Sequence, residues 1–233
     1  FTGYDPSWTV ATQLAPLGAD KFAARDFQYL FDSPVEIAPL QVRQWSAKEG
    51  NSNYTIRLMV HSKDKPEAID KFAAMAEKIY RVQVAIWGDI PDYDHGTYSF
   101  LADYVPYASG DGMEHRNSTY LVDQQSLEED GFSQIGTLSH EVFHSWNVER
   151  LRPKELEPFD FSRANPTPSL WLAEGFTSYY GPLAIRRAAI DDVDTFLSQT
   201  GRTLNSLINS PARQYGGRWP AWRVEPLFAE HRL

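Results

Sequence analysis

The sequence predicts an α+β fold in which a β-sheet lobe is followed by a helical lobe. Two segments of the first half, residues 54–61 and 96–105, alternate apolar and polar side chains, and this period of two is typical of half-buried strands. Apolar residues between 64 and 88 recur at spacings of three and four, as in an amphipathic helix, and the pattern becomes helical again after residue 133. Strands followed by helices indicate this fold class.

The composition is that of a folded chain with an acidic surface. The 233 residues suffice for one large domain or two small ones, and 42% of them are hydrophobic. The net charge of −9 repels phosphate backbones, which argues against nucleic acid as a partner. The sequence contains no run of eighteen apolar residues, so it does not indicate a transmembrane helix. Because cysteine is absent, any zinc site must use histidine and carboxylate ligands.

The individual elements follow from local patterns. The helix over residues 64–88 begins with a predicted capping box of Asp64 and Glu67, and Pro66 lies in its first turn, where a missing N–H does no harm. A loop follows the second strand, and a short edge strand is expected from Met113. The first predicted strand places four residues on one face: Tyr54, Ile56, Leu58 and Val60.

The segment LSHEVFHSWNVERLRP, residues 138–153, contains two histidines four residues apart. On an α-helix His140 and His144 lie about 40° apart around the axis and about 6 Å along it, so both can bind one ion. Glu141 is rotated by about 100° from His140 and can reach a water on that ion. The spacing therefore predicts a metal site with its own general base. The alternative is two surface histidines on an amphipathic helix.

A third ligand is expected because catalytic zinc usually has three protein ligands. Glu174 lies in LWLAEGFTSYYG, residues 170–181, in the middle of an otherwise apolar helical run. A buried carboxylate needs a partner or a cation. The 30 residues between His144 and Glu174 leave room for a loop before a second helix packs against the first. The sequence thus predicts one Zn²⁺ per chain, held by His140, His144 and Glu174.

The segments HEVFHSWN and WLAEGFTSYY resemble the gluzincin peptidases, most closely the M61 family of glycyl aminopeptidases and next the M1 aminopeptidases. GDGMEH, residues 110–115, is similar to the Gly-x-Met-Glu motif of both groups. The resemblance implies that Glu114 binds the free α-amine of a peptide, and that Gly112 and Met113 line the cleft. It also implies that the peptide adds to the edge strand.

The resemblance implies a thermolysin-like zincin catalytic domain over residues 34–233, whose helical lobe is incomplete. Residues 1–33 would be the end of an N-terminal β domain, and the chain would be a piece of a longer protein. An oxyanion-stabilising tyrosine is expected downstream of Glu174. The tyrosines there are Tyr179, Tyr180 and Tyr215, all imperfect matches. Ser178 stands where thermolysin has an aspartate that orients a zinc histidine.

Residues close to the motifs carry further predictions. His115 either contacts substrate or is a solvated histidine of the edge strand. Asn147 caps or orients the end of the helix, with a structural role favoured. We expect Trp146 and Trp171 to be core aromatics that hold the two ligand helices together.

Two charged runs are also open to interpretation. The basic run of residues 150–154 compensates the dipole at the helix C-terminus, or alternatively offers an arginine to a substrate carboxylate. Asp89, Asp92 and Asp94 lack the glycine and the final glutamate of a calcium loop, so a turn is expected there.

The predicted function is a zinc metalloaminopeptidase that hydrolyses the first peptide bond of peptides with a free N-terminus. The resemblance adds a preference for N-terminal glycine or alanine. Two alternatives are a thermolysin-like endopeptidase and a zinc-binding chain without turnover, and a third is a peptide-binding module that needs no metal. The oligomeric state stays open, and so does the compartment, with bacterial cytoplasm and periplasm both compatible.

Overall fold

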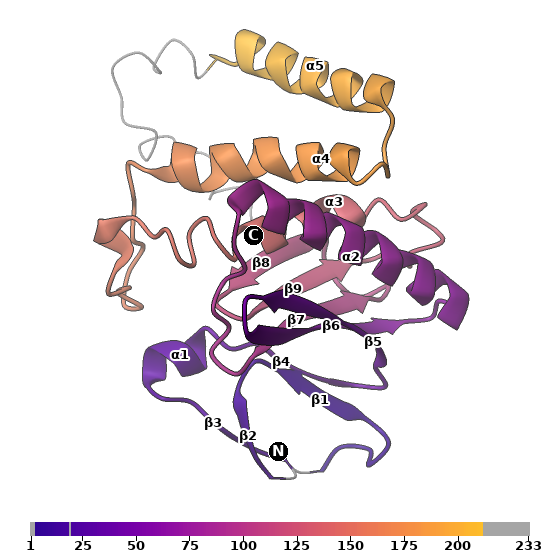
Figure 1. Ribbon diagram of the computed structural model, residues 1–233, viewed down its shortest axis with the longest axis vertical. Helices are drawn as coiled ribbons and strands as arrows, with labels where there is room; N and C mark the ends of the chain where they lie inside the picture. The colour runs from indigo at the N-terminus through magenta and orange to yellow at the C-terminus, as the bar shows by residue number, and fades with distance from the viewer. Residues whose placement is uncertain (1–2, 19, 212–233) are drawn as a thin grey trace.

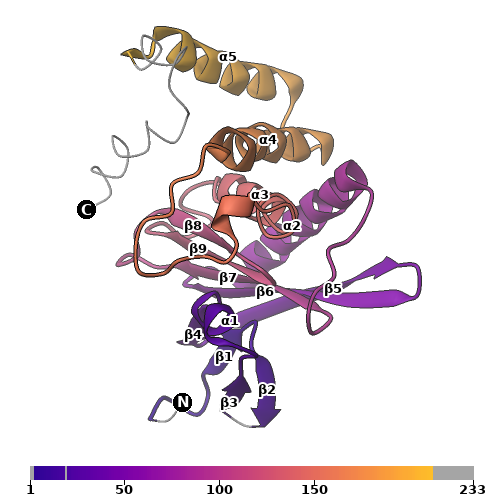
Figure 2. The same cartoon turned by 90° about the vertical axis from the view of Figure 1, so that its left-hand side faces the viewer.

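The computed structural model describes residues 3–18 and 20–211, and it combines small N-terminal strands, a central sheet and a set of helices (Figure 1). The mixed α/β character predicted from the sequence is confirmed. In both views α2, α3, α4 and α5 lie on one side of the central sheet, whereas the N-terminal strands and α1 lie on the other (Figures 1 and 2). The strands are β1 (Thr9–Thr12), β2 (Ala15–Gly18), β3 (Lys21–Ala23), β4 (Val35–Ala38), β5 (Gln41–Glu49), β6 (Ser52–Ser62), β7 (Thr97–Tyr104), β8 (Asp111–His115) and β9 (Ser118–Asp123). The helices are α1 (Phe27–Phe31), α2 (Pro66–Trp87), α3 (Ile135–Phe143), η1 (Lys154–Leu156), η2 (Trp171–Phe176), α4 (Thr177–Arg187) and α5 (Val193–Asn209).

The central sheet has the strand order β5-β6-β7-β9-β8. β6, β7 and β9 run parallel, while β5 and β8 pair antiparallel to their neighbours at the two edges. The two strands predicted from alternation are confirmed as β6 and β7, and the expected edge strand is β8, which starts two residues before Met113. Ile56, Leu58 and Val60 of β6 are fully buried in the main core, as their shared face predicts.

Helix α2 packs the predicted apolar stripe onto this sheet. Ile69, Phe72, Ala76 and Ile79 are fully buried in the same core. Gln83, the one polar residue of the stripe, donates from Nε2 to the carbonyl of Ser139 at 2.7 Å. This polar interruption therefore connects α2 to α3, the helix that carries the two histidines.

The capping box predicted at the start of α2 is wrong. The N-cap is Lys65, and its side chain makes no capping hydrogen bond. Asp64 is instead buried and accepts from the backbone N–H groups of Leu127 (2.8 Å) and Glu128 (3.1 Å). The Asp64 carboxylate, which the local pattern assigned to the start of α2, thus binds backbone groups that are distant in the sequence.

The N-terminal strands are hydrogen-bonded to the rest of the chain. β1 pairs antiparallel with β4, so the expected domain boundary at residue 33 runs between two paired strands. Gln13 donates to the carbonyl of Asp32 at 2.7 Å and accepts from the N–H of Asn117 at 2.8 Å and the hydroxyl of Ser118 at 2.9 Å. The side chain of Gln13, which follows β1, thereby joins the end of α1 to the start of β9.

The helices after residue 133 form the side of the molecule that carries the histidine motif. The predicted second helix is present as the π-helical turn η2 followed by α4. Trp146 is buried as expected, but Trp171 is 60% exposed, so its assignment to the core is wrong. Trp171 is the first residue of η2, and its ring contacts Phe176 of the same turn, with centroids 5.9 Å apart. None of the described helices has the length and apolar character needed to cross a lipid bilayer.

The role of Asp64 can be tested by substitution. We expect Asp64→Ala to lower the free energy of unfolding by about 2–3 kcal/mol, because it leaves two backbone N–H groups without their charged acceptor. Glu67→Ala, the matched change at the exposed end of the predicted capping box, should cost less than about 1 kcal/mol. Urea unfolding of both variants measures the difference. Equal losses would show that Asp64 acts only through the helix end.

Candidate active site

The two motif histidines lie at the C-terminal end of α3. His144 is the C-cap residue and is buried, whereas His140 is one turn earlier and partly exposed. Their Nε2 atoms approach to 3.1 Å, and the two rings meet edge to face with centroids 4.9 Å apart. Both side chains therefore aim one nitrogen at the same point, as the spacing of four predicts.

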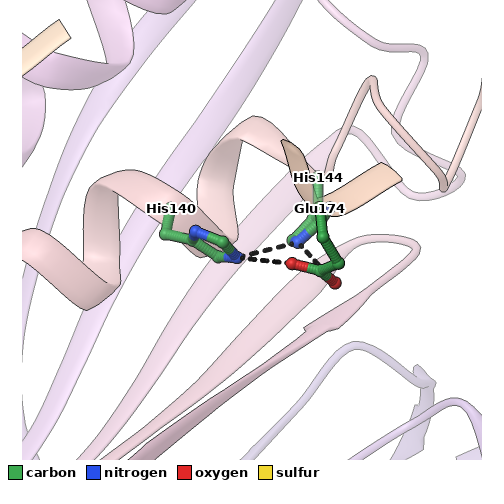
Figure 3. A group of neighbouring side chains, drawn as sticks. All are labelled: His140, His144 and Glu174. Carbon is green, nitrogen blue, oxygen red and sulfur yellow. Dashed lines mark hydrogen bonds and ion pairs between the residues drawn. The ribbon is translucent and has the colours of Figure 1, made fainter. Parts of the chain in front are cut away.

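Glu174 reaches this point from the second helical segment (Figure 3). Its Oε2 lies 3.2 Å from Nε2 of His140, and its Oε1 lies 3.7 Å from Nε2 of His144. The residue lies within η2, and π-helical turns inside helices occur frequently at functional sites. The structure thus brings together the three residues that the sequence singled out from segments 30 residues apart.

The three donors fit a zinc ion. Tetrahedral ligands at the usual Zn–N and Zn–O distances lie about 3.3 Å from one another. The observed separations of 3.1, 3.2 and 3.7 Å are close to this value. Two imidazoles and one carboxylate are also a donor set that catalytic zinc uses, with a fourth position left for water or substrate.

The ring of His144 is oriented by Asn147. Nδ1 of His144 lies 2.8 Å from the carbonyl oxygen of Asn147, and the hydroxyl of Thr177 is 3.4 Å from the same nitrogen. The sequence pointed to Ser178 for this task, but Ser178 is exposed. A histidine ligand whose other nitrogen is hydrogen-bonded keeps its tautomer and orientation.

Asn147 also connects the two ligand-bearing segments. Its Nδ2 donates to the carbonyls of Leu172 and Ala173, each at 2.9 Å, and to the hydroxyl of Thr177 at 3.1 Å. The structural role predicted for Asn147 is confirmed, but its partners across the chain were not foreseen. The signal in the sequence is a polar amide three residues after the second histidine, in an otherwise buried segment.

Glu141 lies beside the three candidate ligands and is only 6% exposed. Burial, together with the nearby charges of Glu114 and Glu174, raises the pKa of Glu141 to about 9. A bound divalent cation would lower that pKa, because it favours the charged carboxylate.

The edge strand β8 passes directly over Glu141. A Cβ atom on Gly112 would lie 2.7 Å from both Cγ and Cδ of Glu141, so any larger residue there would require the Glu141 side chain to move. Met113 points outward and is 57% exposed, while Glu114 lies with Glu141 and His144 in a group whose ligand atoms are all within 4.8 Å. The three residues assigned to substrate binding therefore lie next to the candidate metal site.

His115 points to the other side of this strand. It is buried and its Nδ1 lies 3.0 Å from Oδ1 of Asp32, so the interpretation as a solvated histidine is wrong. Asp32 also accepts from the backbone N–H of Arg116 at 3.1 Å. The pair fastens β8 to α1, the short helix of the N-terminal segment.

A cavity of about 700 Å³ opens beyond Glu114. Phe31, Phe159 and Phe161 form part of its wall, and Glu149 also lines it. Burial and the charge of Asp32 raise the pKa of Glu149 to about 7, against the effect of Arg152, whose guanidinium lies 3.1 Å away.

The remaining predicted residues have structural partners. Arg150 donates to the carbonyls of Arg116, Ser145 and Asp92, and is thereby engaged with the protein's own backbone. Asp89 accepts from the indole of Trp146 at 3.1 Å, in agreement with the predicted turn. Tyr180 stacks on Phe143 and Tyr179 is exposed, while Tyr215 lies outside the described residues.

Comparison with known proteins bears on this site directly. Residues 133–217 match the family model of the M61 glycyl aminopeptidases. The resemblance predicted from the motifs is thereby confirmed, and the matched segment contains the histidines and Glu174. No curated protein matches the sequence.

Solved structures show the same relationship at the level of the fold. The aminopeptidase N family protein from Idiomarina loihiensis is 26% identical, with a TM-score of 0.70 over 82% of this chain and 34% of its own. The M1 zinc metallopeptidase from Deinococcus radiodurans is 15% identical, with a TM-score of 0.55 over 86% of this chain and 42% of its own. A mutant of that protein bound to a Tyr-Ser-Ala substrate has a TM-score of 0.54 at 15% identity, over 88% of this chain and 43% of its own. The chain thus spans between a third and a half of the length of these proteins and shares their fold over most of its own length.

The importance of Asn147 for the site is testable by measuring zinc affinity. We expect Asn147→Ala to weaken Zn²⁺ binding by about 10–100-fold, because it releases the turn that carries Glu174 while leaving all three donors in place. Competition with a chromophoric chelator measures the affinity. Asn53→Ala, at an exposed position of β6, is the control and should bind as the wild type does. Unchanged affinity in Asn147→Ala would contradict the role given to this residue.

Proposed function

We propose that this chain carries the catalytic centre of a metalloaminopeptidase, which hydrolyses the N-terminal peptide bond of peptides. The observation that carries the proposal is the convergence of His140, His144 and Glu174 at distances that fit zinc, beside the buried Glu141. The match of residues 133–217 to the M61 family and the likeness to M1 metallopeptidases support it.

The proposal includes the organisation of the chain. Residues 34–233 are assigned to a thermolysin-like metallopeptidase domain, with the five-stranded sheet as its β lobe and the segment from α3 onward as its helical lobe. Residues 1–33 are assigned to the end of an N-terminal β domain. The edge of the β lobe, β8, would then face the peptide.

The chemistry assigned to the chain is proton transfer by Glu141. When bound by His140, His144 and Glu174, one Zn²⁺ per chain would polarise the scissile carbonyl and acidify the attacking water. Glu141 takes a proton from that water as it adds to the carbonyl, and then gives the proton to the amine that leaves. The low exposure of Glu141 supports this role, since a carboxylate in a dry site is a stronger base than one in water.

Glu114 determines where the peptide is cut. Its carboxylate would hold the α-ammonium group of the substrate, so that the first peptide bond lies at the metal. The other edge of β8 has no partner strand among the described residues, and it is available for main-chain hydrogen bonds to the peptide. The preference for N-terminal glycine or alanine is part of the proposal and comes from the M61 resemblance.

One observation favours an endopeptidase as the second candidate. The cavity of about 700 Å³ is lined by Glu114 together with Phe31, Phe159 and Phe161, so it offers room for more of a peptide than its first residue. In an endopeptidase Glu114 would be structural, and the peptide would extend through this space. The two functions differ in their need for a free α-amine.

The first test compares glycyl and alanyl anilides with their N-acetylated counterparts, using the zinc-loaded protein. We expect hydrolysis of the free-amine substrates only, because the acetyl group removes the charge that Glu114 binds. Glu114→Gln should raise KM for the free-amine substrates more than it lowers kcat. Equal cleavage of both forms would refute the aminopeptidase and favour the endopeptidase.

The role of Glu141 has its own test. We expect Glu141→Gln to lower kcat by about 10²–10⁴-fold while zinc remains bound, because the amide cannot accept the proton. Zinc content by mass spectrometry separates this effect from loss of the metal. An active Glu141→Gln protein would remove Glu141 as the general base.

A glycine pair tests the contact between β8 and the base. We expect Gly112→Ala to reduce kcat by at least about 10²-fold, since its Cβ displaces the Glu141 carboxylate from its position. Gly110→Ala is the matched control, because a Cβ there would lie 3.8 Å from Asp123, an ordinary contact. Both variants should keep the wild-type thermal midpoint within a few degrees. Equal activity of the two variants would contradict the close approach.

A further inference from the structure

A second group of metal-binding side chains lies on the opposite face of the central sheet. Glu36 of β4, His61 of β6 and Asp103 of β7 each offer one ligand atom, and these atoms all lie within 4.8 Å of one another. His61 and Asp103 are neighbours in the parallel β6–β7 register, with Nδ1 of His61 2.8 Å from Oδ1 of Asp103. β4 lies on the side of the sheet away from α2, so Glu36 approaches this pair from the N-terminal strands (Figures 1 and 2).

Glu36 is the observation that calls for an explanation. It is 7% exposed, and neither of its carboxylate oxygens has a hydrogen-bond partner among the described residues. The inside–outside pattern is also reversed at this point of β4, because the apolar Val35 is exposed while the acidic Glu36 is buried. A buried polar group without a partner is rare in folded proteins, and violations of the inside–outside pattern occur mainly at functional sites.

The charges around Glu36 favour a cation at this position. In the described part of the chain, the only ion pair made by either carboxylate is that between Asp103 and His61. Burial and the charge of Asp103 raise the pKa of Glu36 to about 8. With a neutral imidazole and Glu36 ionised, the two carboxylates carry two negative charges, which a divalent cation would neutralise.

We propose that Glu36, His61 and Asp103 form a second divalent-metal site, which takes Zn²⁺. Calcium is disfavoured, because it requires six to eight oxygen ligands and this group contains an imidazole among only three residues. His61 and Asp103 are partly exposed, so water can complete a fourth position. The ion replaces the proton on Glu36, and its binding therefore releases a proton.

The site is structural rather than catalytic. It joins β4, which pairs with β1, to two central strands of the sheet, and so fastens the N-terminal segment to the sheet. Within the described residues, the apolar cluster that connects the N-terminal strands to this face of the sheet is small, with Ala11, Met59 and Leu101 as its buried members. Zinc would add a cross-link where apolar burial is small.

The decisive measurement is the zinc content of metal-depleted protein after equilibration with buffered Zn²⁺. We expect two ions in the wild type, one in Glu36→Gln, one in the double variant His140→Ala/Glu174→Gln, and none when all three changes are combined. Loss of one ion in Glu36→Gln supports the site even if the catalytic centre binds no zinc, so the two proposals fail separately. Equal zinc content in the wild type and Glu36→Gln would overturn it.

Thermal unfolding gives a second readout. In the His140→Ala/Glu174→Gln background, free Zn²⁺ at about 100 times the dissociation constant should raise the midpoint by roughly 5–10 °C. Adding Glu36→Gln should abolish this rise, whereas Glu77→Gln, an isosteric change on the outer face of α2, should leave it intact. Circular dichroism of the metal-free proteins checks folding. If Glu36→Gln does not fold, Asp103→Asn replaces it and must also remove one ion, since retention of that ion would overturn the proposal.

Discussion

The site depends on the hydrogen bonds that Asn147 makes in two directions. Its carbonyl oxygen holds the ring of His144, and its amide group holds two carbonyls of the turn that carries Glu174. The backbone that follows, at Val148, has a φ of 104°, a value that costs a β-branched residue about 1–3 kcal/mol. This strain is tolerated because the bonds of Asn147 on one side and the buried Glu149 on the other determine the path of the chain. The two ligand-bearing helices are therefore coupled through one short segment.

Three acidic side chains are buried at different places in the structure. Glu141, Glu149 and Glu36 are all buried, and burial is the largest cause of the raised pKa in each. Their surroundings differ. Glu149 has Arg152 at 3.1 Å, whereas the charged groups that act on Glu141 within the described residues are the carboxylates of Glu114, Glu174 and Asp111, and Glu36 has Asp103. A cation is therefore more favourable beside Glu141 and Glu36 than beside Glu149.

The sequence predicted those parts of the fold that depend on local periodicity. The strands β6 and β7, the helix α2 and the histidine helix all follow from spacings of two, three and four residues, and the three candidate ligands meet as expected. Two of the predictions that failed depend on distant partners. Asp64 bonds to Leu127 instead of capping its own helix, and His115 pairs with Asp32 from a segment 83 residues away. Glu36 gave no signal, since a single acid in a short strand is ordinary until the fold shows that it points inward.

Gly112 shows how the binding edge and the base are linked. Many glycines are needed for a local backbone conformation, as at Gly88, where a φ of 85° ends α2. Gly112 matters because a methyl group there would occupy the place of the Glu141 side chain. The strand that would align the peptide is thus in contact with the carboxylate that would take the proton. With the roles proposed for β8 and Glu141, any displacement of β8 would move the peptide and Glu141 relative to each other, so binding and proton transfer would not vary independently. The position of the sheet edge would then contribute to catalysis as well as to affinity.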